Sequence, residues 1–95
     1  MRNYELTMIL TTKAAEEGEP VAVEKVSQYV TQKGGVVSEI NHWGRRKLAY
    51  PIQRFREGHY VLALLQLEPE WITELEESLE LSDEVLRYLL VRREG

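Results

Sequence analysis

The sequence contains no cysteine, and this absence excludes both a disulfide framework and a thiolate metal site. Imidazole ligands are scarce too, because His42 and His59 are the two histidines of the chain. No stretch approaches the ~18 consecutive apolar residues that a membrane-spanning helix requires. The N-terminus also lacks an apolar run typical of a signal peptide. We therefore expect a soluble protein that uses no membrane, no metal and no cofactor.

One segment of the chain lacks positive charge and another lacks negative charge. Residues 68–84 carry eight carboxylates and neither Lys nor Arg. Residues 41–56 show the opposite pattern, with no carboxylate in a protein of formal net charge -4. Five cations lie in that basic segment: Arg45, Arg46, Lys47, Arg54 and Arg56. This separation predicts a charge dipole whose basic end attracts a polyanion while its acidic end repels it.

The basic segment admits two interpretations. A highly charged hairpin that is simply solvated would explain the cations without any partner. However, Trp43, Tyr50 and Phe55 are interleaved with the cations, and planar rings beside guanidinium groups suit phosphate contact combined with base stacking. We therefore favour a nucleic-acid contact for residues 41–56.

Hydrophobic periodicity divides the chain into six elements of secondary structure. Residues 3–11 alternate, so that Tyr4, Leu6, Met8 and Leu10 share one face of a strand. A helical spacing of apolar residues begins with Pro20 in its first turn and ends at Gly34 and Gly35. A second strand is predicted over 36–52, interrupted at Gly44 and ending at a sheet edge near Pro51. A polar tip over 53–57 leads to a third strand over 58–67. A second helix beginning at Pro69, a turn over 81–83 and a strand over 85–93 complete the chain.

A chain of 95 residues buries too little surface for two cores, so we expect one domain over residues 1–95. The order strand, helix, strand, strand, helix, strand is the split βαβ arrangement of the ferredoxin-like α+β fold. Right-handed crossovers then place both helices on one face of a four-stranded antiparallel sheet, with the first and third strands central.

The other face of this sheet has no element to cover it. Strand alternation predicts apolar side chains there, namely Ile9, Tyr60, Leu62, Leu64, Leu89 and Val91. Single exposed apolar residues are common on soluble proteins and need no explanation. Here the residues fall on neighbouring strands, and a contiguous apolar patch is typical of a surface that binds a partner.

Catalysis has little support in the sequence. His42 and His59 belong to no recognisable triad, and neither a glycine-rich phosphate loop nor a paired-carboxylate pattern is present. A ferredoxin-like acyl phosphate or nucleotide enzyme would need an arginine in a phosphate cradle after the first strand, which this chain lacks. An RNA-recognition motif would need several stacking aromatics on the third strand, where Tyr60 is followed by Leu62 and Leu64. We expect no enzyme.

The basic segment includes a long and specific run, Gly-Arg-Arg-Lys-Leu-Ala-Tyr-Pro-Ile, from Gly44 to Ile52. Shorter matches occur at Met1-Arg2, Tyr4-Glu5, Trp43, Gly58, Tyr60 and Leu86-Arg87-Tyr88-Leu89-Leu90-Val91. Across essentially the whole chain, these residues resemble the bacterial small-subunit ribosomal protein six family. The resemblance implies a ferredoxin-like structural protein of the cytoplasmic ribosome. It further implies binding of small-subunit (16S) ribosomal RNA jointly with small-subunit ribosomal protein eighteen, with which it would form a heterodimer.

The resemblance and the basic hairpin together give two sets of candidate site residues. The RNA-binding candidates are Arg2, Tyr4, Arg45, Arg46, Lys47, Arg54, Arg56, Arg87 and Arg92. The candidates for the protein-partner face are Ile9, Tyr50, Tyr60, Leu62, Leu64, Leu89 and Val91. We expect a monomer when the protein is isolated. A protein-only interaction module, or a homodimer through the open sheet face, is the alternative that the same apolar pattern allows.

Overall fold

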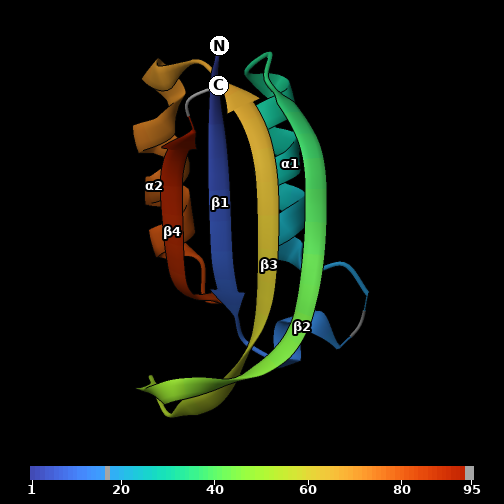
Figure 1. Cartoon of the computed structure of the whole chain (residues 1–95), viewed down its shortest axis with the longest axis vertical. Coiled ribbons are helices and arrows are strands. Elements are labelled where there is room, and N and C mark those ends of the chain that lie inside the picture. The colour runs from blue at the N-terminus through green and yellow to red at the C-terminus, as the bar shows by residue number, and fades with distance from the viewer. Residues whose placement is uncertain (17, 94–95) are drawn as a thin grey trace.

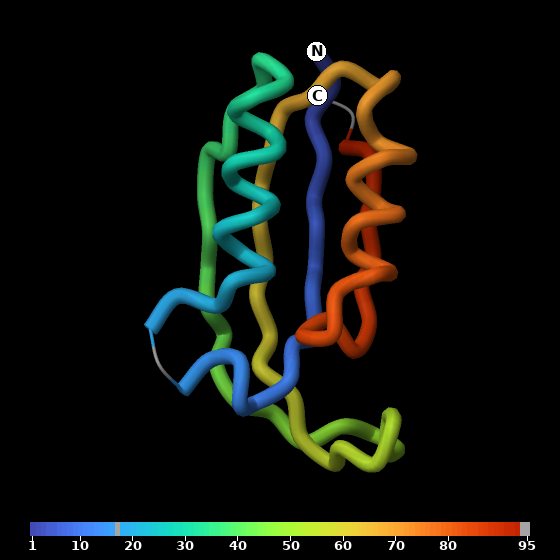
Figure 2. The backbone as a smooth tube through the Cα atoms, turned by 180° about the vertical axis from the view of Figure 1, so that it is seen from behind, coloured from blue at the N-terminus to red at the C-terminus, as the bar shows by residue number. Residues whose placement is uncertain are grey.

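The computed structural model describes residues 1–16 and 18–93. Within them, one antiparallel sheet has the strand order β2-β3-β1-β4, and both helices cover the same face of it (Figures 1 and 2). The elements are β1 (Arg2–Leu10), a short 3-10 turn (Lys13–Ala15), α1 (Val21–Gln32), β2 (Val36–Ile52), β3 (Phe55–Leu67), a second 3-10 turn (Pro69–Trp71), α2 (Ile72–Leu81) and β4 (Val85–Arg93). The predicted ferredoxin-like fold is confirmed, with β1 and β3 as the central strands.

The core lies between the sheet and the two helices. Alternate residues of β1 point into it, from Tyr4 to Leu10, and their side chains are buried. They pack against the apolar stripes of the helices, which include Val26 of α1 and Leu75 of α2. Each fully buried side chain of this size contributes about 1.5–3 kcal/mol, so the alternation along β1 largely decides which face receives the helices.

Several predicted boundaries were wrong by a few residues, for local reasons. Pro20 is the residue that precedes α1 and lies outside its first turn. The second helix begins as the 3-10 turn at Pro69 and becomes α-helical at Ile72. The polar tip predicted over 53–57 is only two residues long, because Gln53 and Arg54 both adopt positive φ and β3 already starts at Phe55. Positive φ at both central residues is the requirement of a type I′ hairpin turn.

The β2–β3 hairpin is longer than the sheet, and its distal part bends across the ends of β1 and β4 (Figure 1). The register shifts between His42 and Gly44, as predicted for the interruption at Gly44, where φ is 86°. It shifts again between Lys47 and Ile52, so that residues 48–51 of β2 face the single residue Arg56 of β3. Pro51 lies in this irregular part of an edge strand, as predicted.

Candidate nucleic-acid interface

The basic segment forms the projecting end of the molecule. Arg45, Arg46 and Lys47 lie where the hairpin extends beyond its pairing with β1, and Arg54 lies in its turn. All five cations of residues 41–56 have exposed side chains. Arg45 is 3.7 Å from the Glu57 carboxylate, an exposed pair of the kind that contributes little to stability. The hairpin therefore presents its positive charge to solvent at one end of the protein.

These cations are distributed over both sides of the hairpin. Residues that are directly opposite in an antiparallel pair point to the same side. Arg46 is opposite Gly58, which belongs to the open side of the sheet, whereas Lys47 is opposite Glu57 on the other side. A polyanion could therefore contact the hairpin along either side or wrap its tip.

The other RNA-binding candidates lie elsewhere. Arg2 and Arg92 are at the end of the sheet that is remote from the hairpin, near the two chain termini (Figure 1). Arg87 lies near the hairpin, at the start of β4. Tyr4 is a correction, because its side chain is only 6% exposed and belongs to the core cluster. A buried ring offers no face on which a base could stack, so Tyr4 is removed from the candidate set.

The open face of the sheet collects the predicted partner residues. Ile9 is flanked by Tyr60 of β3, and Thr7 lies between Leu62 of β3 and Leu89 of β4. Leu89 is 63% exposed, although it is large and apolar. The strand alternation predicted from the sequence thus places these side chains side by side on one surface.

One carboxylate interrupts this face. Glu5 of the central strand β1 lies between Leu64 of β3 and Val91 of β4, and it is half-buried. A carboxylate among apolar neighbours gains most from a cationic or hydrogen-bond-donating partner, because an unpaired buried charge is costly. The open face therefore suits a basic protein better than an acidic one.

Negative charge is concentrated on α2, which packs on the helix-covered face of the sheet, nearest the viewer in Figure 2. The Tyr88 hydroxyl of β4 donates to carboxylate oxygens of Glu80, at 2.8 Å, and Glu76, at 3.1 Å. Burial and these two carboxylates raise the pKa of Tyr88 well above the ordinary tyrosine value. The acidic helix is thus tied to the sheet on the face opposite the predicted partner surface.

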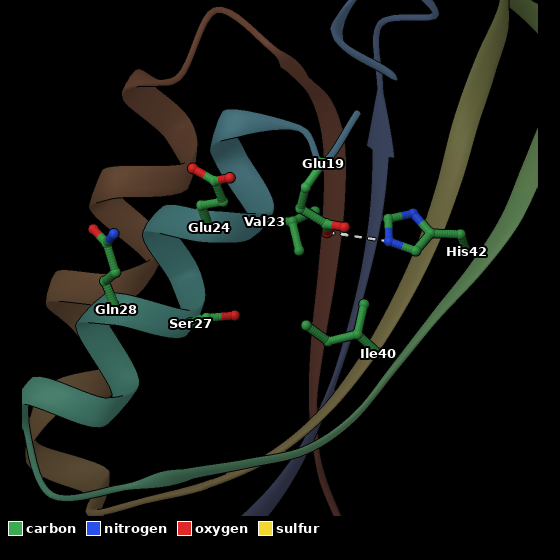
Figure 3. A pocket seen from close by; sticks show the side chains of 7 residues that line it. All are labelled: Glu19, Val23, Glu24, Ser27, Gln28, Ile40 and His42. Atoms are coloured by element: carbon green, nitrogen blue, oxygen red, sulfur yellow. Dashed lines mark hydrogen bonds and ion pairs between the residues drawn. The ribbon is translucent and has the colours of Figure 1, made fainter. Parts of the chain in front are cut away.

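A chain of three titratable groups lies at the base of the hairpin. His42 Nε2 is 3.1 Å from Glu19 Oε1 (Figure 3). His42 Nδ1 is 3.1 Å from His59 Nε2. Burial lowers the pKa of His59, the neighbouring His42 lowers it further, and Glu19 partly compensates. The contacts tie the segment before α1 to β2 and β3.

The same region carries a shallow groove between α1 and β2, of about 410 Å³. Its floor is apolar, with Val23 and Ile40 facing one another, while Glu19 and His42 meet at one end (Figure 3). Across residues 1–16 and 18–93, no group of three or more His, Asp or Glu side chains is arranged to hold a metal ion.

The comparisons with known proteins agree with this geometry. A family model described as ribosomal protein S6 matches residues 3–92. The chain belongs to the ribosomal protein S6 family. Among its relatives, the small ribosomal subunit protein bS6 of Clostridium novyi is 43% identical over 94 residues, covering 99% of each chain. The bS6 protein of Moorella thermoacetica is 39% identical over 94 residues, covering 99% of this chain and 96% of its own.

Solved structures extend the comparison to three dimensions. The 30S ribosomal protein S6 of Thermotoga maritima superimposes with a TM-score of 0.87 at 29% identity, over 97% of this chain and 87% of that one. The C-terminal domain of the MgtC protein from Mycobacterium tuberculosis gives a TM-score of 0.67 at 17% identity, over 99% of this chain and 89% of that one, which shows a shared fold only. The resemblance to the S6 family, and with it the predicted location on the cytoplasmic ribosome, is confirmed. None of the described helices is long and apolar enough to span a membrane.

Sequence reasoning missed two features of this S6-family site. Tyr50 contacts Arg87 across the sheet, and the chain from Glu19 to His59 joins three segments that are distant in sequence. The first depends on how far the hairpin bends, and the second on the register of β2 against β3 and on the position of Glu19 before α1, none of which periodicity reports. The burial of Tyr4, in contrast, had a signal, because Tyr4 shares its strand face with Leu6.

Proposed function

We propose that the protein is a non-catalytic structural constituent of the small ribosomal subunit that binds 16S ribosomal RNA together with small-subunit ribosomal protein eighteen. Residues 1–95 would act as one domain. The observation that carries the proposal is the projecting hairpin of an S6-family chain, which bears five exposed cations within a carboxylate-free segment of an acidic protein. Such a surface attracts a polyanion while the rest of the molecule repels it.

The hairpin is the proposed RNA contact. Phosphate neutralisation by lysine and arginine releases counterions, so the logarithm of affinity falls linearly with the logarithm of salt concentration. Five neutralised phosphates would give a slope of roughly -3.5 to -4.5. Arg2 and Arg92 are proposed as a second, separate contact at the far end of the sheet, reached by an RNA that spans the protein.

A charge-matched pair of variants tests the hairpin. Arg46→Ala with Lys47→Ala removes two hairpin cations, and Lys13→Ala with Lys25→Ala removes two exposed cations from outside the hairpin. We expect the first pair to reduce the salt slope of RNA binding by about 1.4–1.8 and the second to leave it unchanged. Equal slopes for both pairs would remove the hairpin from the RNA site.

The open sheet face is the proposed surface for the protein partner. Its apolar rows run over three strands, and Glu5 at the centre favours a basic protein. An acidic chain with a local basic end would bind RNA weakly alone. It would bind better beside a basic partner, which adds further phosphate contacts to the complex.

A second matched pair tests this face. Leu89→Asp places a charge on the open face, where the leucine is 63% exposed, whereas Leu81→Asp places one at the end of α2, where it is 83% exposed. Both leucines are on the surface, so both variants should fold. We expect Leu89→Asp alone to impair association with the partner, and equal association of the two variants would show that the partner binds elsewhere.

The alternative is a homodimer that buries the same face against itself. Glu5 counts against it, because a twofold axis through the sheet would bring two copies of this carboxylate into one apolar interface. Sedimentation over a range of concentrations distinguishes a monomer from a homodimer. We expect the isolated protein to remain monomeric, and a concentration-dependent dimer that Leu89→Asp dissolves would favour the alternative.

A further inference from the structure

Arg87 of β4 contacts Tyr50 of β2. Its guanidinium group donates a hydrogen bond to the Tyr50 hydroxyl, with 2.5 Å between nitrogen and oxygen, and its Cζ is 5.5 Å from the centre of the ring. In the sheet order β2-β3-β1-β4, these two strands are the opposite edges. The contact is possible only because the hairpin bends back across the sheet (Figure 1).

Three local features bring Tyr50 to this position. The four residues 48–51 face only Arg56, so the extra length of β2 bows out of the ladder. Gly58 has no side chain at the bend, where a Cβ would lie 2.4 Å from Ile9 Cγ2. Ile9 itself is directly opposite Arg87 in the β1–β4 pair. The hairpin therefore passes closely over the open face and reaches Arg87 at the corner of that face.

We propose that Arg87 is a positioning residue that holds the hairpin against the open face, instead of binding RNA as the family resemblance implied. The inner side of the bent hairpin and the apolar rows of the sheet then form one continuous concave surface for the protein partner. Lys47 lies on the outer side of the hairpin, where it can face RNA, whereas Arg46 lies on the inner side. The partner role rests on the proposed function, whereas the positioning role is a property of the isolated chain.

The chemistry of the contact favours this role. The orientation of a guanidinium group is fixed when it donates to a phenol oxygen and lies near the ring. An arginine that is solvated until it binds phosphate has no such fixed orientation. Phosphate binding by Arg87 would have to use its other N–H donors, because one nitrogen already donates to Tyr50. Tyr50 remains 55% exposed, so its ring stays available to a partner while its hydroxyl is held.

Two variants separate the two roles. Tyr50→Phe keeps the ring and removes the acceptor oxygen, while Arg87→Gln removes the charge. If Arg87 positions the hairpin, each variant should weaken partner binding about fivefold, the size of one lost hydrogen bond. The double variant should be no weaker than Arg87→Gln alone, because both changes remove the same contact. The salt slope of RNA binding by the ternary complex should not change.

The opposite results would overturn the inference. If Arg87 neutralises a phosphate, Arg87→Gln should reduce the salt slope by about 0.7–0.9, Arg87→Lys should restore it, and Tyr50→Phe should leave partner binding unchanged. Unchanged partner binding in both single variants would likewise overturn it.

Nuclear magnetic resonance of the isolated protein tests the positioning independently of any partner. We expect cross-relaxation between the Tyr50 ring and the Arg87 side chain, and increased backbone mobility of residues 48–51 in Arg87→Gln. Absence of that cross-relaxation in the unmodified chain would reject the inference even if RNA and the partner bind as proposed. Failure of the unmodified chain to bind a partner would instead reject the proposed function and leave the positioning role standing.

Discussion

Gly58 lies against Ile9 so closely that a Cβ on Gly58 would be 2.4 Å from Ile9 Cγ2. Only a hydrogen atom fits there, and the close approach allows the hairpin to bend over the open face. Gly58→Ala should therefore destabilise the fold by about 1–3 kcal/mol, the usual cost of overpacking. Urea denaturation of the two proteins measures this difference.

The Ile9→Ala background provides the control for Gly58→Ala. Removing the Ile9 side chain removes its Cγ2 atom and with it the obstruction. In that background Gly58→Ala should cost much less than it does beside isoleucine, and this difference is an interaction free energy between the two positions. Equal costs in both backgrounds would show that the two residues do not press on one another.

The hairpin turn contains two residues with unfavourable backbone geometry. Gln53 and Arg54 have φ values of 47° and 76°, and this left-handed region is costly for residues other than glycine and asparagine. Replacing both, as Gln53→Asn with Arg54→Gly, should stabilise the hairpin by about 1 kcal/mol. Slower amide hydrogen exchange of Phe55 and Arg56 would report this stabilisation, and unchanged protection would contradict the type I′ assignment. RNA affinity should nevertheless fall, because Arg54 is one of the proposed contacts.

Stability should depend on pH through His59. Its pKa is lowered in the folded state by burial and by His42, so the unfolded chain binds more protons as the solution becomes acidic. The protein should therefore lose stability as the pH falls through about 6.5, the ordinary histidine value, towards the folded-state pKa. His59→Gln should reduce this loss between pH 8 and pH 5.5 in urea denaturation. An identical pH dependence in the variant would show that His59 is not perturbed as described.

A hydrogen bond joins α1 to the start of the second helix. The Tyr29 hydroxyl donates to the Trp71 carbonyl at 2.9 Å, and Lys33 covers the Trp71 ring with its Nζ 4.4 Å from the centroid. Tyr29→Phe removes the hydroxyl and should cost about 1 kcal/mol of stability. Thermal denaturation measures the loss, and Tyr60→Phe, which changes a tyrosine of the open face, is the control. An equal loss for the two variants would contradict the assignment.

The sequence predicted the fold because its patterns are local. Alternation from Tyr4 to Leu10 and helical spacing around Val26 each identify an element without reference to the rest of the chain. The order of those elements then leaves few topologies that obey right-handed crossovers. The boundaries at Pro20 and Pro69 were less predictable, since proline is compatible with both the residue before a helix and its first turn.

The site was predicted in composition but only partly in geometry. The charge of Arg46 and the open-face position of Leu89 follow from counting and alternation, which the structure preserves. The contact of Arg87 with Tyr50 depends on a three-residue excess in β2 opposite Arg56, and no periodicity reveals such an excess. The family resemblance grouped Arg87 with the RNA-binding candidates, although its position favours a contact within the protein.

The most direct test of the proposed function is the binding of a central-domain fragment of 16S ribosomal RNA, measured at two salt concentrations with and without the purified basic partner. The proposal predicts weak binding by the protein alone and tight, salt-sensitive binding when the partner is present, both reduced by Arg46→Ala with Lys47→Ala. Absence of RNA binding in the presence of the partner, or binding that salt does not weaken, would contradict it.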